Sequence, residues 1–93
     1  MHIAALTAQI EIAGAQSLKD KRQVVRSVLD TIRAKFNVSA AEVDDLDLRQ
    51  KASLGFAVVS NDAAFIDQVL EKVVDTLERE PRCVVIDYQR ENL

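Results

Sequence analysis

The sequence is poor in the residues that most site chemistry requires. Its 93 residues include one cysteine, one histidine, two glycines, one proline and no tryptophan. Cys83 alone cannot form an intrachain disulfide, and together with His2 it provides too few soft ligands for a structural zinc site. The glycine and proline content is also too low for a linker or a collagen-like array. We therefore expect neither a metal site nor a cofactor.

Long apolar segments are missing as well. No run approaches the roughly 20 residues that span a bilayer, and the stretch Met1–Leu6 lacks the basic segment that opens a signal peptide. The formal net charge of −3 is unlike that of a protein that coats nucleic acid, although it is compatible with a local basic patch. We expect a cytoplasmic protein with no membrane partner and no DNA partner.

What the chain does contain predicts one compact domain, residues 1–93. Hydrophobic residues make up 48% of the chain and charged residues 29%, which is too apolar for a disordered tail. Apolar and polar residues alternate from Ala4 to Ile12, which is the period-two pattern of a strand. Three more strands are predicted, at about residues 36–43, at about residues 50–60, and at Val84, Ile86 and Tyr88.

Two amphipathic helices separate these strands. Ser17 can N-cap a helix that begins at Leu18, and a second helix opens after Ser60–Asp62 and ends before Pro81. Apolar residues recur in both at spacings of three, four and seven. The order β-α-β-β-α-β predicts an α+β, ferredoxin-like fold, a four-stranded antiparallel sheet in the order 4-1-3-2 with both helices on one face.

Several segments resemble a known family over nearly the whole chain. They are Ser17–Arg22 with Val24–Ser27, Phe36–Ser39 with Ala41–Val43, and Leu54–Asp62. The sequences SLKDKR and VVSND at this separation are similar to the YlxP-like family of bacterial domains, whose function is unassigned. The resemblance implies a ferredoxin-like fold and no established catalytic residues. It also points to RNA or the ribosome, because in many bacteria the family's genes lie beside those for transcription termination and translation initiation. Many members carry an aromatic residue where this chain has Arg49.

The first predicted helix carries a concentration of positive charge. Half of the twelve basic residues lie between Leu18 and Phe36, against only Asp20 and Asp30. At about 100° per residue, four of them fall on one side of the apolar stripe. We call Lys19, Arg22, Arg26 and Arg33 the basic ridge. With the free N–H groups of the helix start at Ser17, this ridge suits phosphate or another anion. The alternative is a solvated face in which Asp30 pairs with Arg26 and Arg33.

The sheet face away from the helices is predicted to be small and apolar. We expect it to carry Ile3, Ala5, Thr7, Ser53, Gly55, Ala57, Val59 and Val85. An antiparallel sheet with a solvated face normally alternates apolar and polar residues, and the polar half is missing in the third strand. Such a patch usually marks an interface. We therefore expect a homodimer through Ala5, Ser53, Gly55, Ala57 and Val59, and the alternative is a monomer with a slightly apolar surface.

Enzymatic and metal-binding alternatives have weaker support. An acylphosphatase-like anion loop is glycine-rich after the first strand, where this chain has Gly14 alone. Asp44, Asp45 and Asp47 could hold a hard divalent ion, but a solvated turn with Asx hydrogen bonds explains them better. Cys83 is most simply a small packing residue. We therefore expect a non-enzymatic protein.

Two functional hypotheses remain. The first is an accessory factor that contacts RNA or a ribosomal particle through the basic ridge. The second is a homo-oligomeric protein-interaction module without nucleic-acid binding, and anion sensing at Ser17 has the least support. Phe56 has the same parity in its strand as Leu54 and Val58, so we expect it to face the core, where RNA bases cannot stack on it. RNA would therefore be bound through its phosphates.

Overall fold

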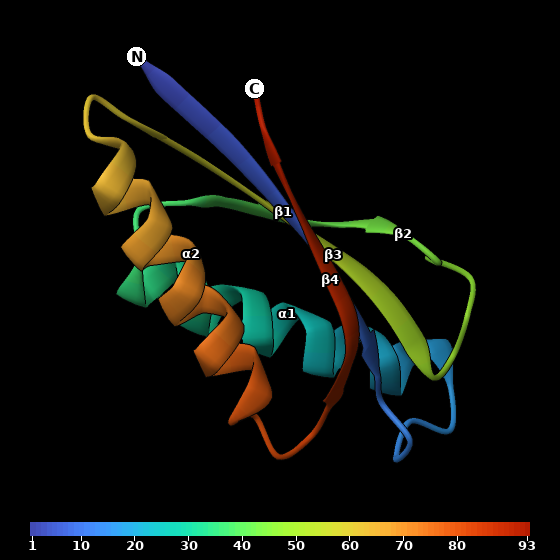
Figure 1. Cartoon of the computed structure of the whole chain (residues 1–93). Helices are drawn as coiled ribbons and strands as arrows, with labels where there is room; N and C mark the ends of the chain where they lie inside the picture. The colour runs from blue at the N-terminus through green and yellow to red at the C-terminus, as the bar shows by residue number, and fades with distance from the viewer.

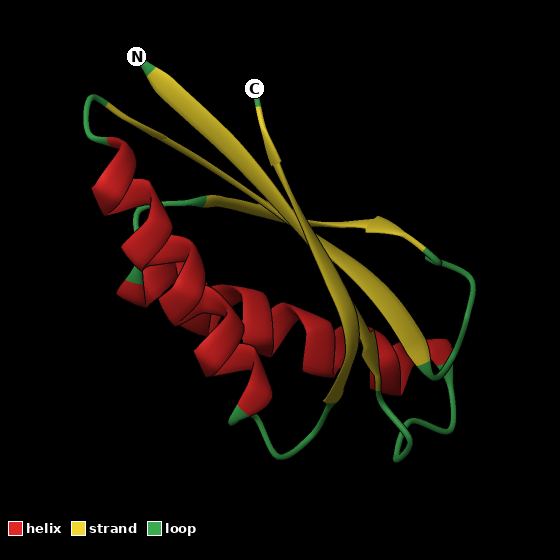
Figure 2. Cartoon of the chain, viewed as in Figure 1, coloured by secondary structure: helices red, strands yellow, loops and turns green.

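The computed structural model describes residues 1–93 and contains four strands and two helices (Figure 1). The elements are β1 (His2–Glu11), α1 (Leu18–Lys35), β2 (Ser39–Asp44), β3 (Lys51–Ser60), α2 (Ala63–Glu78) and β4 (Val84–Asn92). Neighbouring strands are antiparallel in the order β2-β3-β1-β4, and both helices cover one face of the sheet (Figure 2). The predicted ferredoxin-like arrangement is confirmed.

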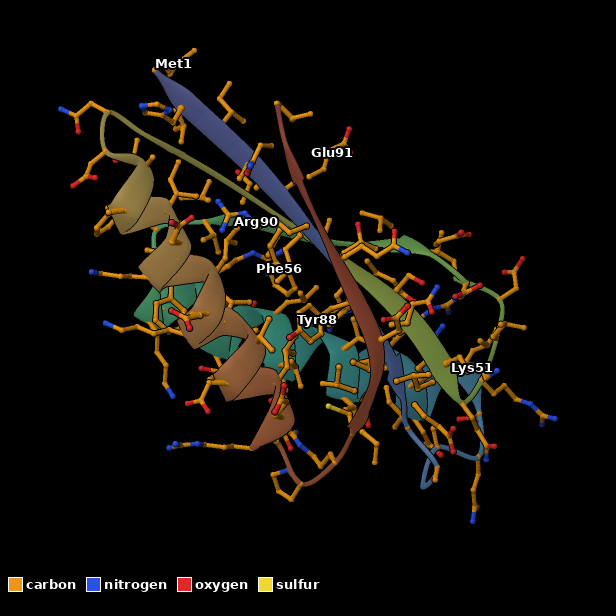
Figure 3. All side chains as sticks on the ribbon, viewed as in Figure 1. Met1, Lys51, Phe56, Tyr88, Arg90 and Glu91 are labelled. Atoms are coloured by element: carbon orange, nitrogen blue, oxygen red, sulfur yellow. The ribbon has the colours of Figure 1, made fainter.

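The core lies between the sheet and the two helices. Every second residue of β1, from Ala4 to Ile10, is buried, which is the alternation expected of a strand with one covered face. α1 packs against β2, and α2 packs against the other three strands. Phe56, in the middle of β3, points into the layer between sheet and helices (Figure 3). The sheet's opposite face has no helix over it, and we call it the open face.

The two ends of α1 are fixed by local contacts. Ser17 Oγ accepts a hydrogen bond of 3.1 Å from the Asp20 N–H, which confirms the predicted helix start. At the other end, the Phe36 backbone is extended while its N–H still donates to Ile32 O. The prediction that the second strand begins at residue 36 is wrong, because Phe36 closes the helix and packs on the core, and pairing with β3 begins at Ser39.

α2 begins at the predicted position. Asp62 is its N-cap, and its Oδ1 accepts a hydrogen bond of 2.9 Å from the Ala64 N–H. The helix ends at Glu78, shortly before Pro81, in agreement with the predicted stop. Neither α1 nor α2 combines the length and the apolar character needed to cross a membrane.

The last strand departs from regular alternation. The register between β1 and β4 shifts, so that Val85 lies opposite Ile10 while Asp87 lies opposite Gln9. The extra residue, Ile86, forms a β-bulge. Val85 therefore shares the helix-covered face with Ile10 and packs against the core. The prediction that Val85 belongs to the open face is wrong for this reason.

Candidate functional site

Three cations of the basic ridge stand free on the outer surface of α1. Lys19, Arg22 and Arg26 are exposed, and the ion pairs of the chain are formed by other cations. Asp30 pairs with Arg33 and not with Arg26, although both pairings were expected from their spacing. An exposed arginine without an internal partner keeps its whole fork of donors for a ligand such as phosphate.

The fourth member of the ridge, Arg33, is already engaged. Its Nη1 lies 3.1 Å from Asp30 Oδ1, and its Nη2 donates a hydrogen bond to the Ala40 carbonyl of β2. This contact places the ridge on the side of α1 that lies next to β2, an outer strand of the sheet. Edge strands need their free polar groups covered. Arg33 therefore has a structural task that the other three cations lack.

The start of α1 is capped by side chains of the chain itself. Ser17 accepts from the Asp20 N–H, and Asp20 Oδ2 in turn accepts a hydrogen bond of 3.1 Å from the Gln16 N–H. This reciprocal arrangement resembles a capping box, and its carboxylate already complements the positive end of the helix dipole. A second anion would meet that charge. Ser17 therefore caps the helix as predicted, and the Asp20 carboxylate beside it disfavours the anion binding that was also predicted there.

The most deeply buried polar side chain of α1 is that of Lys21, which lies outside the basic ridge. Lys21 is 0% exposed, although Lys19 two positions earlier is on the surface. The Lys21 ammonium donates hydrogen bonds to the carbonyl oxygens of Asp45 (2.9 Å), Leu46 (3.3 Å) and Lys51 (3.1 Å). An ammonium has three donors, so these bonds use all of them. They tie the β2–β3 turn to the first half of α1.

Glu42 provides the counter-charge for Lys21. Its Oε2 lies 2.9 Å from Lys21 Nζ, but this buried oxygen accepts no hydrogen bond, because the ammonium donates to the three carbonyls. The contact is therefore ionic. In the same turn, Asp45 has a φ of 60°, the left-handed region that aspartate tolerates, and its Oδ2 accepts a hydrogen bond of 2.8 Å from Ser53 Oγ. We call Lys21, Glu42, Asp45 and Ser53 the turn lock.

The acidic turn that follows β2 is satisfied by its own backbone and neighbours. Asp44 Oδ1 accepts a hydrogen bond of 2.8 Å from the Asp45 N–H, and the Asp45 carbonyl accepts one from the Leu48 N–H. The first bond joins a side chain to the next residue's N–H and the second is a backbone turn bond, so neither is the two-residue Asx bond predicted for this segment. No three His, Cys, Asp or Glu side chains come close enough together to hold a metal ion.

All five predicted interface residues lie on the side of the open face, and all but Ser53 are accessible there. Ala5 lies opposite Ala57, and Gly55 and Val59 share the same side of β3. Val59 is 57% exposed. Ser53 belongs to this side too, but it is only 2% exposed because the β2–β3 turn covers it. A partner cannot reach Ser53 while the turn is in place, so its prediction as an interface residue is wrong.

The apolar patch on the open face is narrower than we expected from the sequence of β3, because the strands beside it carry polar side chains. A Cβ at Gly55 would lie 2.7 Å from Val43 Cγ1, so glycine is required beneath this valine. Polar side chains of the neighbouring strands occupy much of the remaining face; they are Thr7, Gln9, Glu11, Asp87, Gln89 and Glu91. Tyr88 and Arg90 lie on the helix side of β4, opposite to Glu91 (Figure 3). The polar half that β3 lacks is therefore supplied by β1 and β4.

The segment after α2 is fixed by an ion pair and a buried thiol. Arg82 lies 2.7 Å from Glu80 Oε1 and also donates to Ser27 Oγ at 3.1 Å. The hydrogen bond from Arg82 lowers the pKa of the Glu80 carboxyl below its ordinary value of 4.5. Burial raises the pKa of the Cys83 thiol above its ordinary value of 9.0, and its Sγ donates to Leu77 O. A protonated, buried thiol fits packing and not nucleophilic chemistry.

Comparison with known proteins decides the family. Residues 3–90 match a family described as a protein of unknown function, DUF503. The Bacillus subtilis (strain 168) protein described as uncharacterized protein YlxP is 36% identical over 70 residues, which cover 75% of this chain and 76% of that protein. The chain belongs to the DUF503 family. The resemblance to YlxP-like proteins that the motifs indicated is therefore confirmed.

The fold has a counterpart among solved structures. The solution NMR structure of a de novo designed protein with a ferredoxin fold, LFR1 1, is similar with a TM-score of 0.57. The two chains are 12% identical, and the match covers 99% of this chain and 85% of the designed one. At this level of identity the likeness shows the fold alone. DUF503 membership assigns no catalytic residue, so the basic ridge and the open face are interpreted from their own geometry.

Proposed function

We propose that this protein binds RNA, alone or within a ribonucleoprotein, as a non-enzymatic accessory factor whose contact residues are Lys19, Arg22 and Arg26. The proposal rests on one observation above all: these cations lie together on one flank of α1, exposed and without an internal partner. Arg33 and Lys21, in contrast, are committed to contacts within the chain. Unpaired cations in a row neutralise successive phosphates and release their counterions, which drives association.

The negative charge on α2 favours binding of RNA at α1 and not at α2. The outer surface of α2 carries the exposed acidic residues Asp67, Glu71, Asp75 and Glu78. Asp67 and Asp75 pair with arginines, whereas no ion pair involves Glu71 or Glu78. A polyanion is repelled from such a surface and attracted to the α1 flank even though the net charge of the chain is −3. RNA would therefore bind along α1, with α2 turned away from it.

The experiment that tests this proposal is a salt titration of RNA binding. Fluorescence anisotropy with a labelled RNA hairpin measures the affinity of the wild type and of Arg22→Glu/Arg26→Glu between about 50 and 200 mM salt. Three phosphate contacts predict a slope of about −2 to −3 for the wild type in a plot of log K against log salt concentration. The double variant should bind at least about tenfold more weakly and give a flatter slope.

A matched control separates local contacts from net charge. Lys72→Glu/Arg79→Glu makes the same change of net charge at two exposed residues, one in α2 and the other its C-cap. The Arg79–Asp75 pair that it removes is largely solvated and contributes little to stability. This control should bind as the wild type does. Equal losses in both double variants, or unchanged binding in Arg22→Glu/Arg26→Glu, would contradict a contact at the ridge.

A second candidate function, self-association, is favoured by a separate observation on the open face. Ala5, Ala57 and Val59 form a continuous small apolar surface there, and the nearby Val43 is 51% exposed. Small side chains allow a second sheet to approach closely, and a two-fold dimer is the commonest arrangement of soluble homo-oligomers. We propose a homodimer through this surface as the alternative without nucleic-acid binding.

A further inference from the structure

The unpaired cations of α1 form a single row along the helix axis. Lys19, Arg22 and Arg26 are three and four residues apart, so the helix rise separates them by about 4.5 and 6 Å along its axis. Their directions fall within about 60° of one another at 100° per residue. The steps are comparable with the separation of neighbouring phosphates on one strand. This spacing suits a single backbone that runs along the helix.

Further basic residues lie close to the segment that precedes α1. Arg49 and Lys51 line an open cleft together with Ala15 and Gln16, the residues just ahead of the Ser17 cap. Arg49 and Lys51 are both exposed and no ion pair involves either, but the strand register places Lys51 opposite Glu11, whose negative charge offsets its own. Arg49 therefore adds a fourth free cation at the same end of the molecule as Lys19. Asp47, which also lines the cleft, limits the positive surface on that side.

Exposed aromatic side chains are absent from this half of the molecule. Phe56 is buried and Phe36 is half-buried against the core. The two exposed aromatic residues, Phe65 and Tyr88, lie on α2 and β4, which is the half with the acidic helix surface. The open face carries none. RNA held by the α1 cations thus finds no ring on which an unpaired base can stack.

Resting on the RNA binding proposed above, we infer that the ligand of these cations is base-paired RNA, held by the phosphates of one strand. Proteins that bind unpaired strands gain about 1–3 kcal/mol for each base stacked on an aromatic side chain. Without such rings an unpaired strand offers only its charge, and each phosphate contact then releases fewer counterions than on a duplex, about 0.7 against 0.9 as measured on DNA. Duplex RNA is recognised by its shape, its phosphates and its 2′-hydroxyls. These are the groups that a line of lysine and arginine donors can contact.

The test compares three labelled nucleic acids of equal length with the full-length protein. They are an RNA hairpin with a stem of about 16 base pairs, an unstructured RNA strand, and a DNA hairpin of the same stem sequence. Fluorescence anisotropy at about 50 mM salt gives the three affinities for the wild type, for Arg26→Gln, for Arg49→Gln and for the control Lys72→Gln. The RNA hairpin should bind about tenfold more tightly than the strand.

Arg26→Gln and Arg49→Gln should each weaken the binding of the RNA hairpin about two- to fivefold, because each removes one phosphate contact. The control Lys72→Gln should leave this binding unchanged. Equal or tighter binding of the unstructured strand would overturn the inference and leave the proposed RNA binding intact. Equal binding of the DNA hairpin would overturn the restriction to RNA. Binding of none of the three would overturn the proposed function itself, which separates the two failures.

Discussion

Lys21 of α1 and Glu42 of β2 form an ion pair of 2.9 Å in which the lysine side chain is fully buried and the glutamate side chain is 12% exposed. The pair joins the helix that carries the basic ridge to the strand beside it. Breaking a buried pair on one side leaves the other charge without compensation, which is far more costly than losing a surface pair. We therefore expect the loss of the turn lock to lower the free energy of unfolding strongly.

Replacing Lys21 with methionine tests this relationship. The variant removes the charge and all three hydrogen bonds to the β2–β3 turn while keeping a side chain of similar length. We expect it to lose about 3–5 kcal/mol of unfolding free energy, measured by urea denaturation followed by circular dichroism. The control Lys19→Met, at an exposed position two residues earlier, should change the free energy by less than about 0.5 kcal/mol. A loss below about 1 kcal/mol in Lys21→Met would show that the lock is dispensable.

Much of this arrangement could be predicted from the sequence, and the exceptions have identifiable causes. Periodicity of two and of 3.6 residues located the strands and helices, because one face of each is buried. The same helical period also held the signal for Lys21, which lies four, seven and eleven residues before Val25, Val28 and Ile32. That spacing sets it within the apolar stripe and not on the ridge.

Features that depend on tertiary contacts were beyond the sequence patterns. Alternation along β4 fails at Ile86, because a bulge is a property of the pairing with β1 and not of β4 alone. Ser53 has the parity of the open face but is covered by a turn eight residues earlier. The engagement of Arg33 with Ala40 likewise required the position of β2. Local periodicity carries no information on any of these contacts.

The homodimer proposal is tested at Ala57. An arginine there would place an unpaired charge against the second sheet, so Ala57→Arg should be a folded monomer if the wild type is a dimer through the open face. Sedimentation velocity gives the oligomeric state, and Ala34→Arg, an exposed site on α1, is the control that should dimerise normally. A wild type that is monomeric at high micromolar concentration would exclude the dimer. A dimer that survives Ala57→Arg would exclude this interface.

The Glu80–Arg82 pair predicts a small dependence of stability on pH. Because the pKa of Glu80 is lowered in the folded state, its contribution is present above 4.5, the ordinary value, and is lost as the pH falls through the folded value. Glu80→Gln should be less stable than the wild type at pH 7, by under about 1 kcal/mol because the pair is partly solvated. The two unfolding free energies should converge as the pH falls below the pKa of Glu80 in the folded state. A difference that grows as the pH falls would contradict the pairing.

The raised pKa of Cys83 predicts an unreactive thiol. Since the thiol is buried and stays protonated at neutral pH, its reaction with a disulfide reagent should be more than about tenfold slower in the folded protein than in the chain unfolded by guanidinium. Absorbance of the released thiolate follows both rates. Equal rates would show that Cys83 is accessible and would reopen the question of its chemistry.

The central claim is that RNA contacts the α1 flank of this protein. Backbone amide chemical shifts recorded by NMR during titration with the RNA hairpin test it most directly, because they report every part of the chain at once. If RNA binds there, the perturbed amides should be concentrated between Lys19 and Arg26 and around Arg49, and those of α2 and the open face should be unchanged. Perturbations confined to the open face or to α2, with none on α1, would contradict it.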